Sequence, residues 1–167
     1  YNEIIKTTPK HKCLALNYAL DQRYGTNKIV THDGLSIDCY NIYDIGNFIE
    51  DVKTQPIFLN ASHIFINEGQ FFKNLIHYVI FILEVFKKNI VICGLDYDYK
   101  REKFGDIVDL THYASSCNYL TGQCNTKDCP MPSTCSHRIV QNNEQILIGS
   151  CEYIPLCIKC YEKENIQ

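Results

Sequence analysis

Short apolar runs alternate with longer amphipathic stretches in the first two-thirds of the chain. Residues 13–18, 64–66 and 90–95 form the clearest apolar runs, and residues 57–59 form a weaker one. An unbroken apolar run, unlike an alternating one, is typical of a strand that is buried on both faces of a parallel sheet. These runs therefore predict an α/β fold with a mostly parallel sheet.

A long helix is predicted over residues 71–88. Apolar residues stand there at positions 72, 75, 76, 79, 82, 83 and 86, which is the helical period. Four further residues widen the apolar stripe: Tyr78, Ile80, Phe81 and Val85. Such a helix has more apolar surface than one sheet face covers, so we expect part of it to contact a second subunit. A strand, this helix and the next strand would form a right-handed crossover.

A second crossover is expected between the strand that ends at Tyr18 and the strand around Phe65, with residues 43–52 as its helix. Residues 25–27 and 32–34 combine glycine with Asn or Asp, which predicts turns. The character of the chain changes near residue 120. We therefore expect an α/β core at residues 1–120 and a small C-terminal lobe at residues 121–167.

The C-terminal lobe is rich in cysteine, contains prolines at positions 130, 132 and 155, and includes β-like runs such as residues 145–149. Of the ten cysteines in the chain, seven lie between positions 117 and 160. The chain shows no secretory signal pattern, which favours a metal site over a set of disulfides. The composition of this lobe thus predicts that a metal ion holds it together.

Cys157 and Cys160 have two residues between them, a spacing at which both thiolates can bind one ion. Cys124 and Cys129 offer a second pair, and four thiolates predict a closed, structural zinc site. The first pair has two alternative members, at positions 117 and 135. Three other cysteines lie in apolar runs and are expected to be core residues, at positions 13, 39 and 93.

The overall composition excludes several classes of protein. The chain has 167 residues, of which 46% are hydrophobic and 21% charged, as in ordinary globular proteins. A net charge of -3 gives no reason to expect nucleic-acid binding. The longest apolar stretch, residues 75–86, contains His77 and Glu84, so we expect no membrane span.

The apolar run at residues 64–66 continues directly into Asn67 and Glu68. Ligands of open parallel sheets bind beyond the carboxyl ends of the strands, where a Glu can accept a proton or face a metal ion. Such a residue is common by itself. However, Asn-Glu-Gly-Gln-Phe-Phe at residues 67–72 resembles the Asp-Glu-Gly-Gln-Phe-Phe signature of type II thymidine kinases.

Further segments resemble the same family in the same order along the chain. They are Asp-Gln-Arg-Tyr at 21–24, Thr-His-Asp at 31–33, the loop at 94–105 and the cysteine-bearing segment at 124–161. The resemblance implies transfer of a phosphoryl group from ATP to the 5′-hydroxyl of thymidine, with Mg²⁺ as a cofactor. It also implies a P-loop/RecA-like core with helices on both faces of the sheet, a zinc lobe whose lasso loop closes over the base, and a cytoplasmic tetramer.

The resemblance also implies roles for individual residues. Glu68 would be the general base that accepts the 5′-hydroxyl proton, and Asn67, Asp21 and Arg23 would lie near the phosphates and magnesium. The thymine pocket would be lined by Phe71, Leu95, Tyr99 and Phe104. From the lasso, Ser136 and the backbone around Tyr153 would hold the edge of the base, and Arg101 would help to order the acceptor loop. The zinc ligands would be Cys124, Cys129, Cys157 and Cys160.

The chain departs from the family pattern in three places. The P-loop string G-x-x-x-x-G-K-[ST] does not occur, and residues 2–8 resemble the end of the helix that follows it, so we expect a chain truncated at its start. Asn67 stands where the family has an Asp that holds magnesium, which predicts weaker magnesium binding and slower turnover. The first cysteine pair is spaced x4 instead of x2, and residues 148–153 are one residue short, which leaves base specificity open.

A second hypothesis is therefore a degenerate, non-catalytic relative that serves as a zinc-stabilised binding or oligomerisation module.

Overall fold

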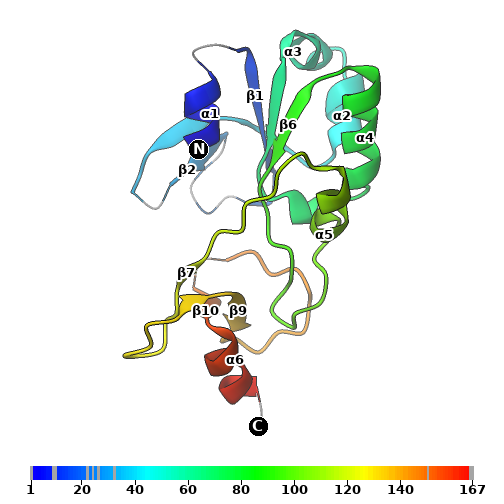
Figure 1. The fold of residues 1–167 in the computed structure, drawn as a ribbon. Coiled ribbons are helices and arrows are strands. Elements are labelled where there is room, and N and C mark those ends of the chain that lie inside the picture. Colours follow the sequence, from blue (N-terminus) through cyan, green and yellow to red (C-terminus); the bar gives the residue numbers. More distant parts are fainter. Residues whose placement is uncertain are drawn as a thin grey trace.

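A four-stranded parallel sheet organises the N-terminal part of the molecule (Figure 1). The computed structural model describes residues 2–8, 11–21, 23, 25, 27–31, 33–149 and 151–165. The strands are β1 (Cys13–Tyr18), β4 (Tyr40–Ile42), β5 (His63–Ile66) and β6 (Asn89–Ile92), in the order β4-β1-β5-β6. Every pairing in this sheet is parallel, as the unbroken apolar runs predicted.

Helices cover both faces of this sheet. Alternate residues of a strand point to opposite faces, so Leu14 and Ile64 lie on one side and Ala15 and Phe65 on the other. The first side packs against α2 (Ile45–Glu50), α3 (Gln55–Asn60) and α4 (Leu75–Val85). On the second side, Ile4 of α1 (Asn2–Thr7) packs against Ala15 and Phe65. The predicted fold class, an α/β core with helices on both faces, is confirmed.

The predicted strands at 13–18 and 64–66 are confirmed as β1 and β5. The weaker candidate at 57–59 is wrong, because these residues lie in α3. That helix carries a proline in its first turn, where the missing N–H leaves no hydrogen bond unmade. Three apolar residues in a row are too few to distinguish a strand from a buried helix turn.

The run at 90–95 is a strand only as far as Ile92. β6 is half-buried and not fully buried, because it is the outer strand of the described sheet. Cys93 is exposed, so its assignment to the core is wrong. Cys39 is buried, and Cys13 packs against the same cluster of side chains, as expected.

The crossover between β1 and β5 is more elaborate than predicted. A hairpin of β2 (Lys28–Val30) and β3 (Ser36–Asp38) precedes β4, and its turn contains Gly34 at φ +80°. The predicted turns at 25–27 and 32–34 flank β2, although Thr26 and His32 lie outside the described residues. The predicted helix at 43–52 is the shorter α2, whose first turn is capped by the Asp44 carboxylate accepting from the Asn47 N–H at 2.8 Å.

The long helix predicted at 71–88 is also shorter, because α4 begins at Leu75 and ends at Val85. Asn74 and Lys87 have left-handed backbone conformations on either side of it, with φ of 56° and 53°. A one-turn 3₁₀ helix, η1 (Gly69–Phe71), occupies the start of the predicted range. Phe81 is 38% exposed and Val85 60% exposed, while Leu75, Val79 and Ile82 are buried. The expected contact with a second subunit stays a prediction.

The chain after β6 forms only small elements, of which α5 still packs on the main core through Leu110, whereas β9, β10 and α6 contribute to a separate cluster of side chains. The small elements are α5 (Ile107–Leu110), η2 (Thr111–Tyr113), β7 (Gly122–Gln123), β8 (Pro132–Ser133), β9 (Cys135–Arg138), β10 (Tyr153–Leu156) and α6 (Ile158–Asn165). β7 pairs with β8, and β9 pairs with β10, both antiparallel. The β-like reading of residues 145–149 is wrong, because the backbone carbonyls of this segment accept from side chains instead of a neighbouring strand. The boundary at residue 120 stays a prediction.

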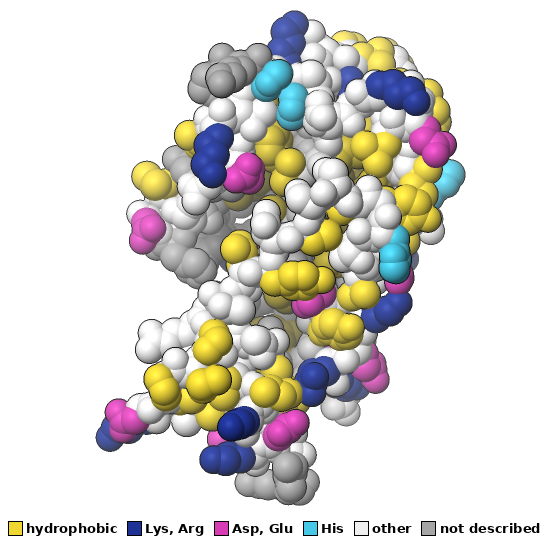
Figure 2. Space-filling view, in the orientation of Figure 1, with side chains coloured by type: hydrophobic (Ala, Val, Ile, Leu, Met, Phe, Trp, Pro, Cys, Tyr) yellow, Lys and Arg dark blue, Asp and Glu magenta, His cyan; other side chains and the backbone are white. Residues whose placement is uncertain are grey.

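Charged side chains are dispersed on the face shown in Figure 2, where the described Lys and Arg residues alternate with acidic ones and form no stripe. Within the described residues, none of the helices combines the length and the apolar character that crossing a bilayer requires.

Candidate functional site

Glu68 lies immediately after β5, at the carboxyl edge of the parallel sheet. Its backbone is left-handed, with φ 55° and ψ 43°, a conformation that residues other than glycine rarely adopt. Gly69 follows in a space where an added Cβ would lie 2.7 Å from the Ile92 side chain. This sharp turn leaves the Glu68 side chain 21% exposed at the edge where ligands of parallel sheets bind.

Each carboxylate oxygen of Glu68 accepts a hydrogen bond. Oε1 accepts from Arg23 Nη2 at 2.7 Å, and Oε2 accepts from Gln70 Nε2 at 2.7 Å. Gln70 is only 4% exposed, and its Oε1 accepts from the Leu95 N–H at 3.1 Å. At Gly105, where φ is +57°, an added Cβ would meet the Gln70 carbonyl oxygen. The loop that follows β6 therefore fixes Gln70, and Gln70 orients Glu68.

Arg23 connects Glu68 to a second carboxylate. Its Nε donates to Asp21 Oδ1 at 2.6 Å and its Nη2 donates to Asp21 Oδ2 at 3.0 Å, in addition to the bond to Glu68. The hydrogen bond with Asp21 raises the pKa of Arg23 above its ordinary value, and the negative charge of Glu68 acts in the same direction. Two carboxylates and one guanidinium thus meet beside the sheet edge, and the Arg23 side chain is 29% exposed.

A chain of amide side chains lies behind these charges, at the ends of three neighbouring strands. Asn67 Nδ2 donates to Asn17 Oδ1 at 2.9 Å. Asn17 is only 2% exposed, and its Nδ2 donates to Asn41 Oδ1 at 3.4 Å and to the Asp21 carbonyl at 3.3 Å. The orientation of the Asn67 amide is therefore set by a buried partner. Asn17 was not among the predicted site residues, although a polar residue inside the apolar run at 13–18 is a signal that could have indicated it.

Only some of the expected pocket residues lie near Glu68. The Phe71 ring packs edge-to-face against Phe104 with centroids 5.4 Å apart, and it lies 5.2 Å from the Tyr18 ring. Phe104 is buried at 6% exposure, whereas Leu95 is 46% exposed. Phe71, Leu95 and Phe104 therefore belong to one region, next to the Gln70 side chain that holds Glu68.

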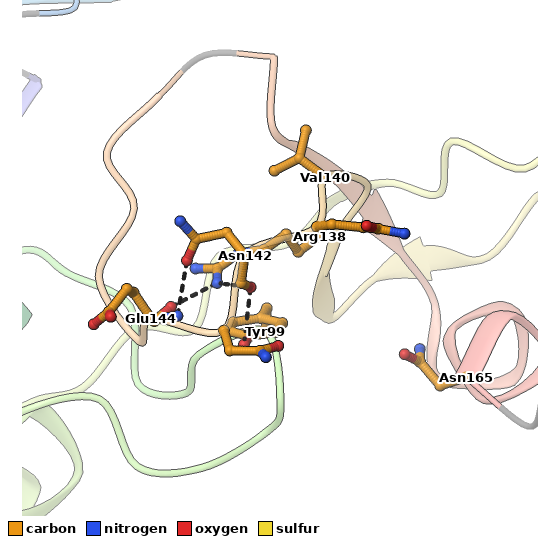
Figure 3. A pocket seen from close by; sticks show the side chains of 8 residues that line it. Tyr99, Arg138, Val140, Asn142, Glu144 and Asn165 are labelled. Atoms are coloured by element: carbon orange, nitrogen blue, oxygen red, sulfur yellow. Dashed lines mark hydrogen bonds between the residues drawn. The ribbon is translucent and has the colours of Figure 1, made fainter.

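Tyr99, Ser136 and Tyr153 lie farther along, where the loop at 94–105 meets the C-terminal part. The Tyr99 ring centroid is 3.6 Å from the guanidinium carbon of Arg138, and the Tyr153 hydroxyl accepts from Arg138 Nε at 3.1 Å. Ser136 stands in β9 opposite Pro155 of β10. A cavity of about 560 Å³ opens here between Tyr99 and the segment after β9 (Figure 3).

Arg101 is exposed near the tip of the 94–105 loop, in a left-handed conformation with φ 64°. No hydrogen bond among the described residues joins its side chain to Glu68 or Asp21. Its backbone N–H donates to the Asp98 carbonyl at 3.0 Å, and the Asp98 carboxylate accepts from two further backbone N–H groups of the same loop. The hydrogen bonds of Asp98, and not the Arg101 side chain, thus stabilise the conformation of this loop.

The four cysteines expected to bind metal come together. The sulfur atoms of Cys124, Cys129, Cys157 and Cys160 all lie within 4.8 Å of one another. Two of these separations are 3.9 Å, from Cys129 to Cys157, and 3.8 Å, from Cys129 to Cys160. Four sulfurs at about 2.3 Å from a tetrahedral zinc ion lie about 3.8 Å from each other, so the group fits that ion.

A backbone hydrogen bond favours one thiolate of this cluster. The Cys157 N–H donates to Cys124 Sγ at 3.3 Å, and this bond is the largest of the causes that lower the pKa of the Cys124 thiol to about 6. For Cys129, a backbone hydrogen bond at Met131 lowers the pKa, but burial and hydrogen bonds with the neighbouring thiols outweigh it and raise the pKa to about 11. Of the two alternative ligands, Cys117 is exposed, and Cys135 is half-buried beside the cluster without joining the group of four. The cluster can therefore hold a metal ion with the pairs that the spacing indicated.

Comparison with known proteins points to one family, both by a family model and by individual relatives. The family model described as thymidine kinase matches residues 5–161. A thymidine kinase of Oryza sativa subsp. japonica is 32% identical over 142 residues, covering 84% of this chain and 51% of the relative. A thymidine kinase of Sheeppox virus is 31% identical, covering 91% of this chain and 81% of the relative. The cytosolic thymidine kinase of Cricetulus griseus is 28% identical, covering 93% and 63%.

The chain thus spans about half the length of the rice relative and less than two-thirds of the hamster one. The match nevertheless covers β1 to the first half of α6, and with it Glu68, Arg23 and the cysteine cluster. The extent of this match shows that the chain belongs to the thymidine kinase family.

Proposed function

We propose that this protein phosphorylates the 5′-hydroxyl of thymidine with ATP, giving thymidine monophosphate and ADP. Membership of the thymidine kinase family supports the reaction class. The observation that carries the proposal is the Glu68 carboxylate, which stands at the sheet edge between a cation and an aromatic cluster. That arrangement offers a general base that can accept a hydroxyl proton, a positive charge that can bind phosphate, and an apolar wall against which a planar nucleobase can pack.

Glu68 would act as the general base. It would take the proton of the 5′-hydroxyl as the oxygen forms its bond to the γ-phosphorus and the bond from that phosphorus to ADP breaks. Phosphoryl transfer depends mainly on positioning and charge stabilisation, so the held orientation of Glu68 matters as much as its basicity. Gln70 maintains this orientation through Oε2.

Arg23 would bind phosphate. Its guanidinium forms ion pairs with the carboxylates of Asp21 and Glu68. A phosphate group carries more negative charge than a carboxylate and would compete with these two carboxylates for the guanidinium. Movement of Arg23 from Glu68 to the phosphate would leave Oε1 free to accept the substrate proton. Asp21 and the side-chain oxygen of Asn67 are the groups that would hold Mg²⁺ here, and the ion would neutralise charge on the phosphates.

Thymidine would lie between the Glu68 region and the C-terminal part. Phe71, Leu95 and Phe104 would form the wall nearest to Glu68. Tyr99 and Arg101 of the 94–105 loop would enclose the base together with Ser136 of β9 and Tyr153 of β10. We assign the zinc ion to Cys124, Cys129, Cys157 and Cys160, where it would hold that part folded.

The remaining assignments follow from the same resemblance. We propose residues 1–120 as the kinase core and residues 121–167 as the zinc lobe. The exposed Phe81 and Val85 of α4 support an oligomer, for which a tetramer is the expected form. We propose a cytoplasmic location, in line with the relative that is named cytosolic.

The test is phosphorylation of thymidine by the full-length protein with ATP and Mg²⁺. We expect ADP and thymidine monophosphate to form in equal amounts, and the reaction to stop when Mg²⁺ is omitted. Deoxycytidine serves as the control nucleoside. A folded, zinc-loaded protein that forms no thymidine monophosphate would support the alternative, a non-catalytic binding or oligomerisation module.

The Asn67→Asp variant tests how the amide limits the reaction. A carboxylate binds a hard cation more tightly than an amide does, so we expect the Mg²⁺ concentration for half-maximal rate to fall about tenfold. Aspartate cannot donate to Asn17 Oδ1, so the Asn17 amide has to turn and lose its bonds to Asn41 and the Asp21 carbonyl. We therefore also expect a loss of about 1 kcal/mol in the free energy of unfolding.

The measurements are an Mg²⁺ titration of the initial rate and a thermal melt. Asn89→Asp, an exposed change at the opposite end of the sheet, is the matched control. An Mg²⁺ dependence that is the same in Asn67→Asp and in the parent would show that residue 67 does not contact the ion.

A further inference from the structure

One side chain shapes the segment at 139–149, which contains no strand or helix. Arg138, the last residue of β9, donates from Nη1 to the Asn142 carbonyl at 2.8 Å and to the Glu144 carbonyl at 2.5 Å. Its Nη2 donates to the Gln145 carbonyl at 3.2 Å. Three backbone carbonyls of the segment therefore converge on one guanidinium, which replaces the partner strand that these carbonyls lack.

The Arg138 guanidinium also holds the C-terminal end of this segment, through the Tyr153 hydroxyl. Arg138 Nε and Nη2 both donate to the Tyr153 hydroxyl, and that hydroxyl donates to the Leu147 carbonyl at 3.0 Å. Tyr153 stands opposite Arg138 in the β9–β10 ladder, so the two side chains project from the base of the loop. The segment is thus tied at its start, its middle and its end.

Arg138 is buried in an unusual way for a cation. It is only 8% exposed, and among the described residues no carboxylate forms an ion pair with it. A buried charge is costly unless its N–H groups are hydrogen-bonded. Backbone carbonyls, the Tyr153 hydroxyl and the face of the Tyr99 ring, 3.6 Å from the guanidinium carbon, together replace water around it.

The Tyr99 ring connects this group to the loop at 94–105, and Figure 3 shows Tyr99 and Arg138 next to Asn142 and Glu144. The Tyr99 hydroxyl donates to the Asn142 carbonyl at 3.4 Å, and its own carbonyl accepts from the Tyr161 hydroxyl at 2.5 Å. Gln145 Nε2 donates to Asp98 Oδ2 at 2.8 Å. The segment at 139–149 is therefore fixed against the loop that also contains Leu95 and Phe104.

We propose that Arg138 is a positioning residue for nucleoside binding: it forms the segment at 139–149 before the nucleoside arrives and seats it on Tyr99. The proposal rests on the proposed function, because the segment is the wall that would enclose the base. A wall that is already ordered spares the complex the entropy cost of ordering it. Arg138 also lines the cavity beside Tyr99, but its guanidinium bonds to backbone carbonyls and to the Tyr153 hydroxyl, so it acts on the nucleoside through Tyr99, Tyr153 and the backbone of the segment.

The kinetic test compares Arg138→Met and Arg138→Lys with the full-length parent. Methionine keeps an unbranched apolar side chain, and lysine keeps the charge but not the planar fork that reaches several carbonyls. We expect both variants to raise the KM for thymidine by about tenfold or more, because the segment has to be ordered on binding. The KM for ATP and kcat should change less than about threefold. Lys163→Met, an exposed cation on α6, is the control and should match the parent.

A second measurement does not depend on activity. The exposed Glu144 is a cleavage site for a glutamate-specific protease inside the segment. Without any substrate, we expect cleavage after Glu144 to be about tenfold faster in Arg138→Met than in the parent and in Lys163→Met. Zinc content and cleavage after Glu84, on α4, should be unchanged, which separates a freed segment from an unfolded protein.

The outcomes distinguish the two proposals. Unchanged cleavage after Glu144 in Arg138→Met would overturn the role of Arg138, whether or not the protein phosphorylates thymidine. Faster cleavage with an unchanged thymidine KM would also overturn it, because the ordered segment would then not serve binding. Faster cleavage in a protein whose parent forms no thymidine monophosphate would overturn the link to nucleoside binding and the proposed function, and would leave Arg138 only as the organiser of the segment.

Discussion

Glu68→Gln is expected to lower kcat for thymidine phosphorylation by about 10²–10⁴-fold, the usual contribution of a general base. The substituted side chain has the same shape, and its carbonyl oxygen can still accept from Arg23, so the ion-pair geometry is disturbed as little as possible. What is lost is the ability to take the proton of the 5′-hydroxyl. The KM for thymidine should remain within about threefold of the parent, because the base contributes to the transition state and little to the ground state.

One structural side effect has to be separated from this result. The new amide nitrogen would face Gln70 Nε2, so that two donors meet, and Gln70 cannot turn without losing its bond to the Leu95 N–H. Glu68→Asp provides the comparison, since it keeps the carboxylate but shortens its reach. Glu84→Gln, on the exposed face of α4, is the matched control. Equal kcat in Glu68→Gln and in the parent, with both proteins folded, would remove Glu68 from the mechanism.

The position of Glu68 could be predicted from the strand that precedes it, and its role from the resemblance of residues 67–72 to the family signature. An unbroken apolar strand indicates a parallel sheet, and a parallel sheet places the end of that strand at the ligand-binding edge. The cysteine pairs could be predicted as well, because two thiolates at short spacing can bind the same metal ion and need only one further pair to complete four ligands. Both features depend on residues that are close together in the sequence.

Other features depend on contacts that leave little trace in the sequence. The β2–β3 hairpin was missed because each of its strands has only three residues, all half-buried or exposed, which gives no clear alternation. β6 ends at Ile92, and beyond it Cys93 bonds to Ile66 and to Gly69 in the turn after β5, a change that an apolar run does not encode. The network from Asn67 to Asn41 joins three strands that are far apart in sequence.

The segment at 139–149 shows the same limit most clearly. Residues 145–149 within it suggested a strand, whereas the carbonyls of Gln145 and Leu147 accept from the side chains of Arg138 and Tyr153. Hydrogen bonds from a side chain to backbone carbonyls impose no residue type on the segment that accepts them. Sequence patterns therefore cannot reveal such an arrangement. Only its donors can be recognised in the sequence, as a basic residue at the end of one short strand and a tyrosine at the start of the next.

Removal of zinc is expected to unfold the C-terminal part while the parallel sheet remains intact. The buried cluster around the cysteines consists of Cys124, Leu156, Cys157 and Tyr161, which is too small a core to fold alone. Structural zinc sites contribute about 10–16 kcal/mol of binding free energy, and that energy becomes folding free energy when the unfolded chain has no site. Loss of the metal should therefore free β9, β10 and α6, and with them the bonds from Tyr161 to Tyr99 and from Gln145 to Asp98.

Cys157→Ser tests this directly, because it removes one buried sulfur of the four and keeps the backbone N–H that donates to Cys124 Sγ. We expect zinc content to fall from about one ion per chain to less than half, amide exchange to become fast in residues 122–165, and β1 and β5 to remain protected. Thymidine binding should be lost with the lobe, because Tyr99 and the segment at 139–149 lose their support. Cys117→Ser and Cys135→Ser are matched controls that remove a thiol outside the group of four, so both should keep the metal. Zinc loss in Cys135→Ser as complete as in Cys157→Ser would contradict the assigned ligands, and full zinc content in Cys157→Ser would contradict the site itself.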